Sequence, residues 1–135
     1  MNSKLIHFPS IKDERGILDV ASTPTEVPFQ IKRFFVTSAS SPMVVRGDHA
    51  HKTSHQLLVA VSGSIKATCD DGRTRIHFLL NSSSFGLYLP PLTWGSQTEF
   101  SEGAKLLVLA SELYDPEDYI ANYSEFISLV LSQES

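Results

Sequence analysis

The chain has 135 residues, of which 41% are apolar and 19% are charged, and its formal net charge is −4 at pH 7. This composition is typical of a folded globular protein, and the length fits one domain with a hydrophobic core. No basic run is longer than Lys32-Arg33, which excludes the clustered positive charge of a typical nucleic-acid-binding protein. We therefore expect a single domain, residues 1–135, with no nucleic-acid partner.

The cysteine content and the N-terminal segment indicate the compartment. Cys69 has no second cysteine to pair with, which suits a reducing environment, and its apolar neighbours predict a small buried strand residue. Charged side chains such as Lys4, Lys12 and Arg15 interrupt the first 20 residues, so no signal-peptide core is present there. No apolar run approaches membrane-spanning length. We expect a cytoplasmic protein without a membrane partner.

Short extended segments separated by turn signals follow one another from the N-terminus. The expected strands cover residues 4–8, 17–20, 31–37, 43–45 leading into the histidine segment, 56–61, 65–69, 73–80, 86–89, 93–100 and 105–110. Pro, Gly, Ser and Asp clusters lie between them, and Asp70-Asp71-Gly72 is a strong hairpin signal. This pattern predicts an all-β sandwich or barrel.

The hydrophobic period changes in the C-terminal tail. Asp115 suits a helix N-cap, Pro116 suits the first helical position, and the acidic residues that follow suit the helix dipole. Apolar side chains then recur at helical spacing from Tyr119 to Leu131. We expect one amphipathic α-helix, beginning after Asp115, on the outside of the β body.

The candidate site lies in residues 46–56, where a polar loop enters an apolar strand. Because side chains alternate along a strand, His49 and His51 are expected on the same face. The spacing Gly47-x-His49-x-His51, with Gln56 and then Gly63, resembles the first motif of the cupin superfamily. That resemblance implies a jelly-roll barrel for the whole chain.

The ligands of a metal-binding cupin are incomplete here. Such cupins carry a glutamate where this chain has Gln56, and a further histidine in a second motif, where this chain has Trp94-Gly95-Ser96. A transition metal usually needs three protein ligands, and only His55 and His77 remain as substitutes. We therefore expect no metal and no other cofactor, and a histidine pair suited to acid/base chemistry near neutral pH. A metal-dependent cupin is the alternative.

Further motifs spread over nearly the whole chain. They include Asp13-x-Arg15-Gly16-x-Leu18, Ile31-Lys32-Arg33, Arg46-Gly47-x-His49-Ala50-His51-Lys52, Gly86-Leu87-Tyr88 and Tyr114-Asp115-x-x-Asp118-Tyr119-Ile120. Together they resemble the dTDP-sugar 3,4-ketoisomerases, WxcM-like cupins that make precursors of 3-amino-3,6-dideoxyhexoses for surface polysaccharide. The resemblance implies a cupin jelly roll with one C-terminal α-helix. It also implies an isomerase that uses no cofactor.

The family's reaction implies a role for each histidine. The substrate is dTDP-4-keto-6-deoxy-D-glucose, whose carbonyl moves from C4 to C3 through an enediol. A base removes the C3 proton and an acid delivers a proton to C4, so base positioning and enediolate stabilisation must act together. Carried over, His51 is the base and His49 the acid, and the reverse order stays open. The stereochemistry of the product at C4 also stays open.

The remaining candidate site residues are expected to bind substrate. Arg46 is a candidate for an enediolate oxygen or the diphosphate, and Gln56 for orienting a histidine or a sugar hydroxyl. Arg15, Lys32 and Arg33 are candidates for binding the diphosphate. Tyr88 and Trp94 are candidates for lining the sugar or thymine pocket. Each of these also has a plainer interpretation, as a solvated surface charge or a core aromatic.

The chain departs from the family near the expected pocket. It has Phe35-Val36 where members have tyrosines, and Gly95-Ser96 where members often have His-Glu. These changes leave open altered stereochemistry, a different sugar, or a non-catalytic cupin that only binds a nucleotide sugar. The resemblance also implies a homodimer with exchanged N-terminal strands.

Overall fold

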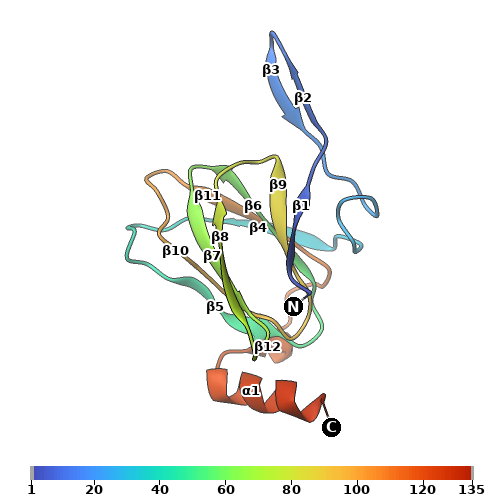
Figure 1. Ribbon diagram of the computed structural model, residues 1–135, viewed down its shortest axis with the longest axis vertical. Helices are drawn as coiled ribbons and strands as arrows, with labels where there is room; N and C mark the ends of the chain where they lie inside the picture. Colours follow the sequence, from blue (N-terminus) through green and yellow to red (C-terminus); the bar gives the residue numbers. More distant parts are fainter. Residues whose placement is uncertain (1, 135) are drawn as a thin grey trace.

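The computed structural model describes residues 2–134, and in it two five-stranded antiparallel sheets face each other (Figure 1). The first sheet has the order β1-β9-β6-β11-β4, with bounds Lys4–His7, Phe85–Leu89, Gln56–Ser62, Lys105–Ala110 and Arg33–Thr37. The second has the order β12-β5-β10-β7-β8, with bounds Tyr119–Ile120, Arg46–His51, Trp94–Thr98, Ile65–Asp70 and Arg75–Leu80. The prediction of an all-β jelly roll is confirmed.

The main core lies between the two sheets. The inward side chains of β6, β7, β9 and β11 fill it, including Leu58, Ile65, Leu87 and Leu106, all essentially without solvent exposure. Cys69 is buried in the same cluster, as its apolar neighbours predicted. Burial of this apolar surface is the main force that holds the sheets together.

Strand β6 is buried on both faces. Its inward residues reach the main core, whereas Leu57 and Val59 point outward and pack with Val27 and Phe29 of the connection before β4. The connection thus covers the outside of the first sheet, which explains why the β6 sequence is apolar without alternation.

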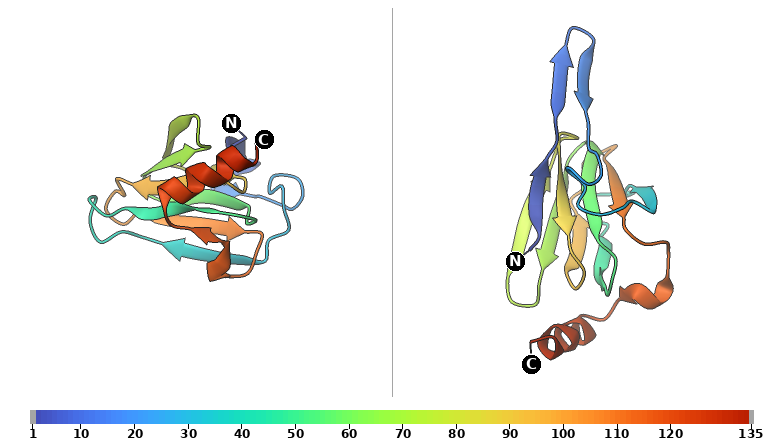
Figure 2. Two further views of the ribbon diagram at one scale, coloured as in Figure 1. Left: turned by 90° about the horizontal axis from the view of Figure 1, so that it is seen from below. Right: turned by 90° about the vertical axis from the view of Figure 1, so that its right-hand side faces the viewer.

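A two-stranded hairpin, β2 (Ser10–Asp13) and β3 (Gly16–Asp19), extends away from the barrel (Figures 1 and 2). Ile11, Ile17 and Leu18 on it are more than half exposed. Only β3 was expected here from the sequence, and the hairpin does not belong to either large sheet.

The predicted C-terminal α-helix is present, but its predicted start after Asp115 is wrong. Asp115 does act as an N-cap, but only for a 3₁₀ turn, η1 (Pro116–Asp118). The chain then pairs with β5 as β12, and the helix α1 (Tyr123–Ser132) begins after a second cap, Asn122. Pairing with β5 and bonds to the Asp118 side chain hold these residues extended, although their apolar spacing is helical.

Helix α1 closes the outside of the second sheet at its β12 end (Figure 2). Phe126 is fully buried against Trp94, Ala50 and Ile120. This cluster fixes the tail, and with it the position of Asp118, relative to strand β5.

Candidate active site

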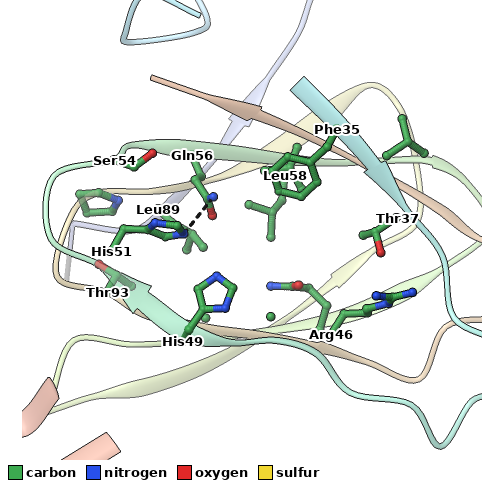
Figure 3. A pocket seen from close by; sticks show the side chains of 16 residues that line it. Phe35, Thr37, Arg46, His49, His51, Ser54, Gln56, Leu58, Leu89 and Thr93 are labelled. Atoms are coloured by element: carbon green, nitrogen blue, oxygen red, sulfur yellow. Dashed lines mark hydrogen bonds between the residues drawn. The ribbon is translucent and has the colours of Figure 1, made fainter. Parts of the chain in front are cut away.

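A cavity of about 330 Å³ opens between the two sheets (Figure 3). Its lining comes from six strands and the β5–β6 and β9–β10 connections, and comprises Phe35, Val36, Thr37, Arg46, Gly47, His49, His51, Ser54, Gln56, Leu58, Leu89, Pro90, Thr93, Gly95, Gln97 and Val108. The cavity is of a size that small-molecule sites use, and both sheets contribute polar side chains to it.

Strand β5 brings three polar side chains to this cavity through a β-bulge. His49 pairs with Gly95 and Arg46 with Gln97, while Gly47 pairs with Ser96, so Asp48 is the extra residue. Gly47 and Asp48 both have positive φ, 72° and 65°. Because the bulge changes the alternation, Arg46 lines the same cavity as His49 and His51.

His51 is oriented by a buried carboxylate. Its Nδ1 lies 2.9 Å from Asp118 Oδ2, and the side chains of both residues are less than 10% exposed. Asp118 Oδ1 accepts hydrogen bonds from the Thr53 backbone amide at 2.7 Å and from the Thr53 hydroxyl at 2.8 Å. With Asp118 ionised, Nδ1 of neutral His51 carries the proton, and Nε2 is left as a base.

The pKa values of the three groups agree with this assignment. Burial lowers the pKa of His51, and the charge of Arg33 adds to this, although the hydrogen bond that His51 donates to Asp118 opposes it. Burial would raise the pKa of Asp118, but the hydrogen bonds from Thr53 and His51 outweigh it and lower that pKa. Burial and the neighbouring His51 lower the pKa of His49. A neutral imidazole beside an ionised carboxylate results.

The two histidines lie side by side. Their ring centroids are 4.9 Å apart, with the ring planes nearly perpendicular. Tyr119 of β12 contacts both rings, with centroids 4.9 Å from His49 and 4.5 Å from His51. Two proton-transfer groups therefore face one small volume of the cavity.

Gln56 also lines the cavity and contacts His51. Its Nε2 lies 3.2 Å from His51 Nε2, so the amide donates to the unprotonated imidazole nitrogen. The sequence-based expectation that Gln56 orients a histidine fits this contact. Among residues 2–134 no group of three or more His, Cys, Asp or Glu side chains is arranged to hold a metal ion.

The other basic candidates lie at different distances from the cavity. Arg46 lines it and donates from Nε to the Ser38 carbonyl at 2.9 Å. Arg33 lies behind the histidines and donates to the Tyr119 hydroxyl at 3.3 Å and the Glu112 carbonyl at 3.0 Å. Neither the Arg33 side chain nor that of Lys32, which pairs with Glu112 at 3.4 Å, lines the cavity.

Arg15 and the two aromatic candidates are not brought to the cavity within this chain. Arg15 lies in the β2–β3 turn, is 85% exposed and pairs with Asp13. The Tyr88 hydroxyl lies 2.7 Å from His55 Nδ1 on the outer face of the first sheet. Trp94 faces helix α1 and donates to Asp48 at 3.1 Å. Strand alternation puts both aromatic rings on outer faces.

The residues that depart from the family pattern do lie at the cavity. Phe35, Val36 and Gly95 line it, whereas Ser96 does not. Phe35 contributes only apolar surface where a hydroxyl was expected. Gly95 pairs with His49 in the sheet, and a Cβ at this position would lie 3.0 Å from Leu89 Cδ1.

Sequence reasoning missed Asp118, Thr53 and Tyr119 as site residues. Asp118 was interpreted as a first-turn helix acid, and Thr53 was passed over as part of a bend. The available signal was the Asp118-Tyr119-Ile120 motif, which belongs to the resemblance but carries no information on its spatial neighbours. Among residues 2–134 no helix is long and apolar enough to cross a membrane.

Comparisons with known proteins agree with this geometry. Residues 1–131 match the family model described as FdtA, WxcM-like, C-terminal. A curated relative from Aneurinibacillus thermoaerophilus, TDP-4-oxo-6-deoxy-alpha-D-glucose-3,4-oxoisomerase, is 38% identical over 93% of this chain and 91% of its own length.

Solved structures of sugar 3,4-ketoisomerases are also similar to this chain. A variant of the 3,4-ketoisomerase QdtA from Thermoanaerobacterium thermosaccharolyticum, in complex with TDP-4-keto-6-deoxyglucose, has a TM-score of 0.93 and 38% identity, covering 98% of this chain and 96% of that one. The TDP-quinovose 3,4-ketoisomerase WlaRB from Campylobacter jejuni has a TM-score of 0.89 and 42% identity, covering 94% and 98%. This chain belongs to the FdtA, WxcM-like family, whose relatives here are sugar 3,4-ketoisomerases.

Proposed function

We propose that this protein is an isomerase that moves the keto group of TDP-4-keto-6-deoxy-D-glucose from C4 to C3. The observation that carries the proposal is the buried His51–Asp118 pair beside His49, all facing one cavity. The family supports the same activity, because its curated member and the ligand-bound neighbour act on or bind this class of sugar.

His51 is the base that removes the C3 proton. Its Nδ1 is tied to Asp118, so the lone pair is on Nε2, where it accepts from the Gln56 amide until the C3–H of the substrate takes that place, and Asp118 stabilises the imidazolium that forms. The electrons of the C3–H bond form the C3–C4 double bond, and the C4 carbonyl becomes an enediolate oxygen.

His49 completes the reaction as the acid. It starts as imidazolium and gives its proton to C4, while the O3 proton passes to O4 and the carbonyl forms at C3. Burial and the neighbouring His51 lower the pKa of His49, so at pH 7 the imidazolium is the minority form of the free protein, and it gives up its proton readily. The proton left on His51 must then return to His49, and the two rings are 4.9 Å apart.

The test is proton exchange in deuterium oxide, followed by NMR. Wild-type protein with TDP-4-keto-6-deoxyglucose should incorporate deuterium at C3 or C4 well above the rate without protein and should yield the 3-keto product. Tight binding without exchange would instead assign the chain as a non-catalytic nucleotide-sugar-binding cupin, for which the apolar Phe35 and side-chain-free Gly95 would be the reason.

We also propose a homodimer in which the N-terminal β2–β3 hairpin packs on a second copy. The hairpin extends from the barrel with Ile11, Ile17 and Leu18 exposed, and such an apolar surface suits an interface. In that arrangement Arg15 is available to the diphosphate of the partner's substrate. Light scattering should give twice the chain mass, and replacing Ile17 and Leu18 with Ser should give monomers.

The cellular role is a further part of the proposal. We propose a cytoplasmic enzyme in the synthesis of 3-amino-3,6-dideoxyhexoses for surface polysaccharide, since a 3-keto sugar is the substrate that an aminotransferase needs. Loss of the amino sugar from the polysaccharide of a deletion strain tests this role.

A further inference from the structure

One side chain of the cavity has no place in the scheme above. Gln97 of β10 lines the cavity, is 8% exposed, and is a carboxamide that both donates and accepts hydrogen bonds. Within residues 2–134 no side-chain hydrogen bond of Gln97 is found, whereas His51 and Gln56 bond each other and Arg46 bonds Ser38. The amide faces the cavity, where a ligand or water completes its hydrogen bonds.

Gly47 makes room for this amide, and Gly95 lies beside it. A Cβ at Gly47 would lie 2.8 Å from Gln97 Oε1, and one at Gly95 would lie 3.8 Å from Gln97 Nε2. Gly47 lies two residues before His49, and Gly95 pairs with His49 across the sheet. The amide therefore lies next to His49, and the backbone around it is shaped to admit it.

Gln97 also lies next to Arg46, its partner in the sheet. Arg46 and His49 come from the same strand and reach the same side of the cavity (Figure 3). A ligand that contacts His49 is thus within reach of the Gln97 amide.

We propose that the Gln97 carboxamide binds the two adjacent oxygens of the sugar's ketol group, and so is a positioning and specificity-determining residue of this enzyme. This inference rests on the proposed isomerase function. An α-hydroxyketone offers one acceptor, the carbonyl oxygen, and one donor, the hydroxyl, on neighbouring carbons. A primary amide offers the complementary donor, Nε2, and acceptor, Oε1, on one edge. The contact holds C3 and C4 in the plane that the histidines need.

The first experiment measures binding without turnover. In a His51→Asn background, the affinities for TDP and for TDP-4-keto-6-deoxyglucose are measured by calorimetry, with and without Gln97→Met, a change that keeps the shape but removes the amide. We expect the affinity for the keto sugar nucleotide to fall about 10-fold, and that for TDP to stay within about twofold, because the amide contacts only the sugar. Equal effects on both ligands would overturn the proposal.

The second experiment measures catalysis in the otherwise wild-type enzyme. Gln97→Met should lower kcat/KM about 10-fold to 100-fold, and Gln97→Glu more, because it adds a negative charge beside the developing enediolate. Ser96→Ala, a neighbour on β10 that does not line the cavity, is the control and should change nothing.

Thermal unfolding separates a ligand contact from a structural role. Because no side-chain hydrogen bond of Gln97 is found among residues 2–134, Gln97→Met should keep or raise the Tm. A lower Tm together with equal losses for both ligands assigns a structural role and overturns the proposal. If wild-type enzyme does not isomerise the keto sugar, the proposed function fails, and the binding experiment still decides whether Gln97 contacts the sugar.

Discussion

The two ends of the cavity differ in how their polar groups are satisfied. At the His51 end each group has a partner in the chain: Asp118 and Gln56 hold the imidazole, and Thr53 holds Asp118. At the other end, no side-chain partner is found for Gln97 within residues 2–134, and Arg46 uses only Nε, toward Ser38. The first end is organised before substrate arrives, as proton transfer requires, and the second awaits the substrate.

Removing the base at the organised end should have the largest effect. His51→Asn should lower kcat by about 10³-fold, because no other group at that position can take the C3 proton. Exchange in deuterium oxide measures it. His77→Asn, at a histidine that bonds Thr68 away from the cavity, is the matched control. Exchange that survives in His51→Asn would move the base to His49.

Breaking the orientation of the base should have the next largest effect. In Asp118→Asn the amide can donate to His51 Nδ1 and so place the imidazole proton on Nε2, the wrong tautomer. We expect kcat to fall about 10²-fold with a smaller change in KM. Steady-state kinetics measure it, and an unchanged kcat would show that Asp118 only anchors the tail.

The pH profile of kcat/KM tests the protonation state of His51. Burial lowers the pKa of His51, so the base form persists below the ordinary histidine value of 6.5. The kcat/KM profile should therefore fall on the acid side only below pH 6.5, approaching tenfold per pH unit. Asp118 raises this pKa, so its replacement by Asn should move the acid limb to still lower pH. A limb above pH 6.5 would contradict the assignment.

Replacing Arg46, at the end of the cavity that contains Gln97, should affect substrate binding rather than the chemical step. Arg46→Gln removes the charge, and we expect KM to rise about 10-fold with kcat within about threefold of wild type. Lys66→Gln, at an exposed residue paired with Glu99, is the control. A loss confined to kcat would instead place Arg46 on the enediolate.

The smallest effect is expected from Thr53→Val. The variant loses the hydroxyl bond to Asp118 but keeps the backbone amide bond, so the carboxylate stays in place. We expect kcat to fall by about threefold. A loss as large as that of Asp118→Asn would mean that the hydroxyl, rather than the carboxylate, organises this end.

The fold and the histidine pair could be predicted from sequence because both rest on local patterns. Strand alternation and turn residues place the strands, and the two-residue spacing places His49 and His51 together. Asp118 could not be placed, since it is separated from His51 by 67 residues and follows a good helix cap. Apolar residues in the tail do have helical spacing, but Tyr119 and Ile120 pair with β5 as a strand, so the helix begins only at Tyr123.

The positions of Tyr88 and Trp94 show a second reason why the site could not be fully predicted from the sequence. An aromatic residue in a strand fits either face, and the local sequence does not say which face borders the cavity. Arg46 shows the converse. Strict alternation would turn it away from His49, and only the bulge at Asp48, which residue patterns do not reveal, turns it inward.

That extra residue separates two functions along the length of one strand. In the proposed function, Arg46 before Asp48 meets the substrate, and His49 and His51 after it are the acid/base pair. Pairing with β10 and β12 holds that pair in position. A one-residue deletion at Asp48 would turn Arg46 out of the cavity and leave the histidines where they are. Homologues that differ in length at this point would then differ in charge recognition while sharing the same chemistry, a route to new substrates that needs no substitution of a catalytic residue.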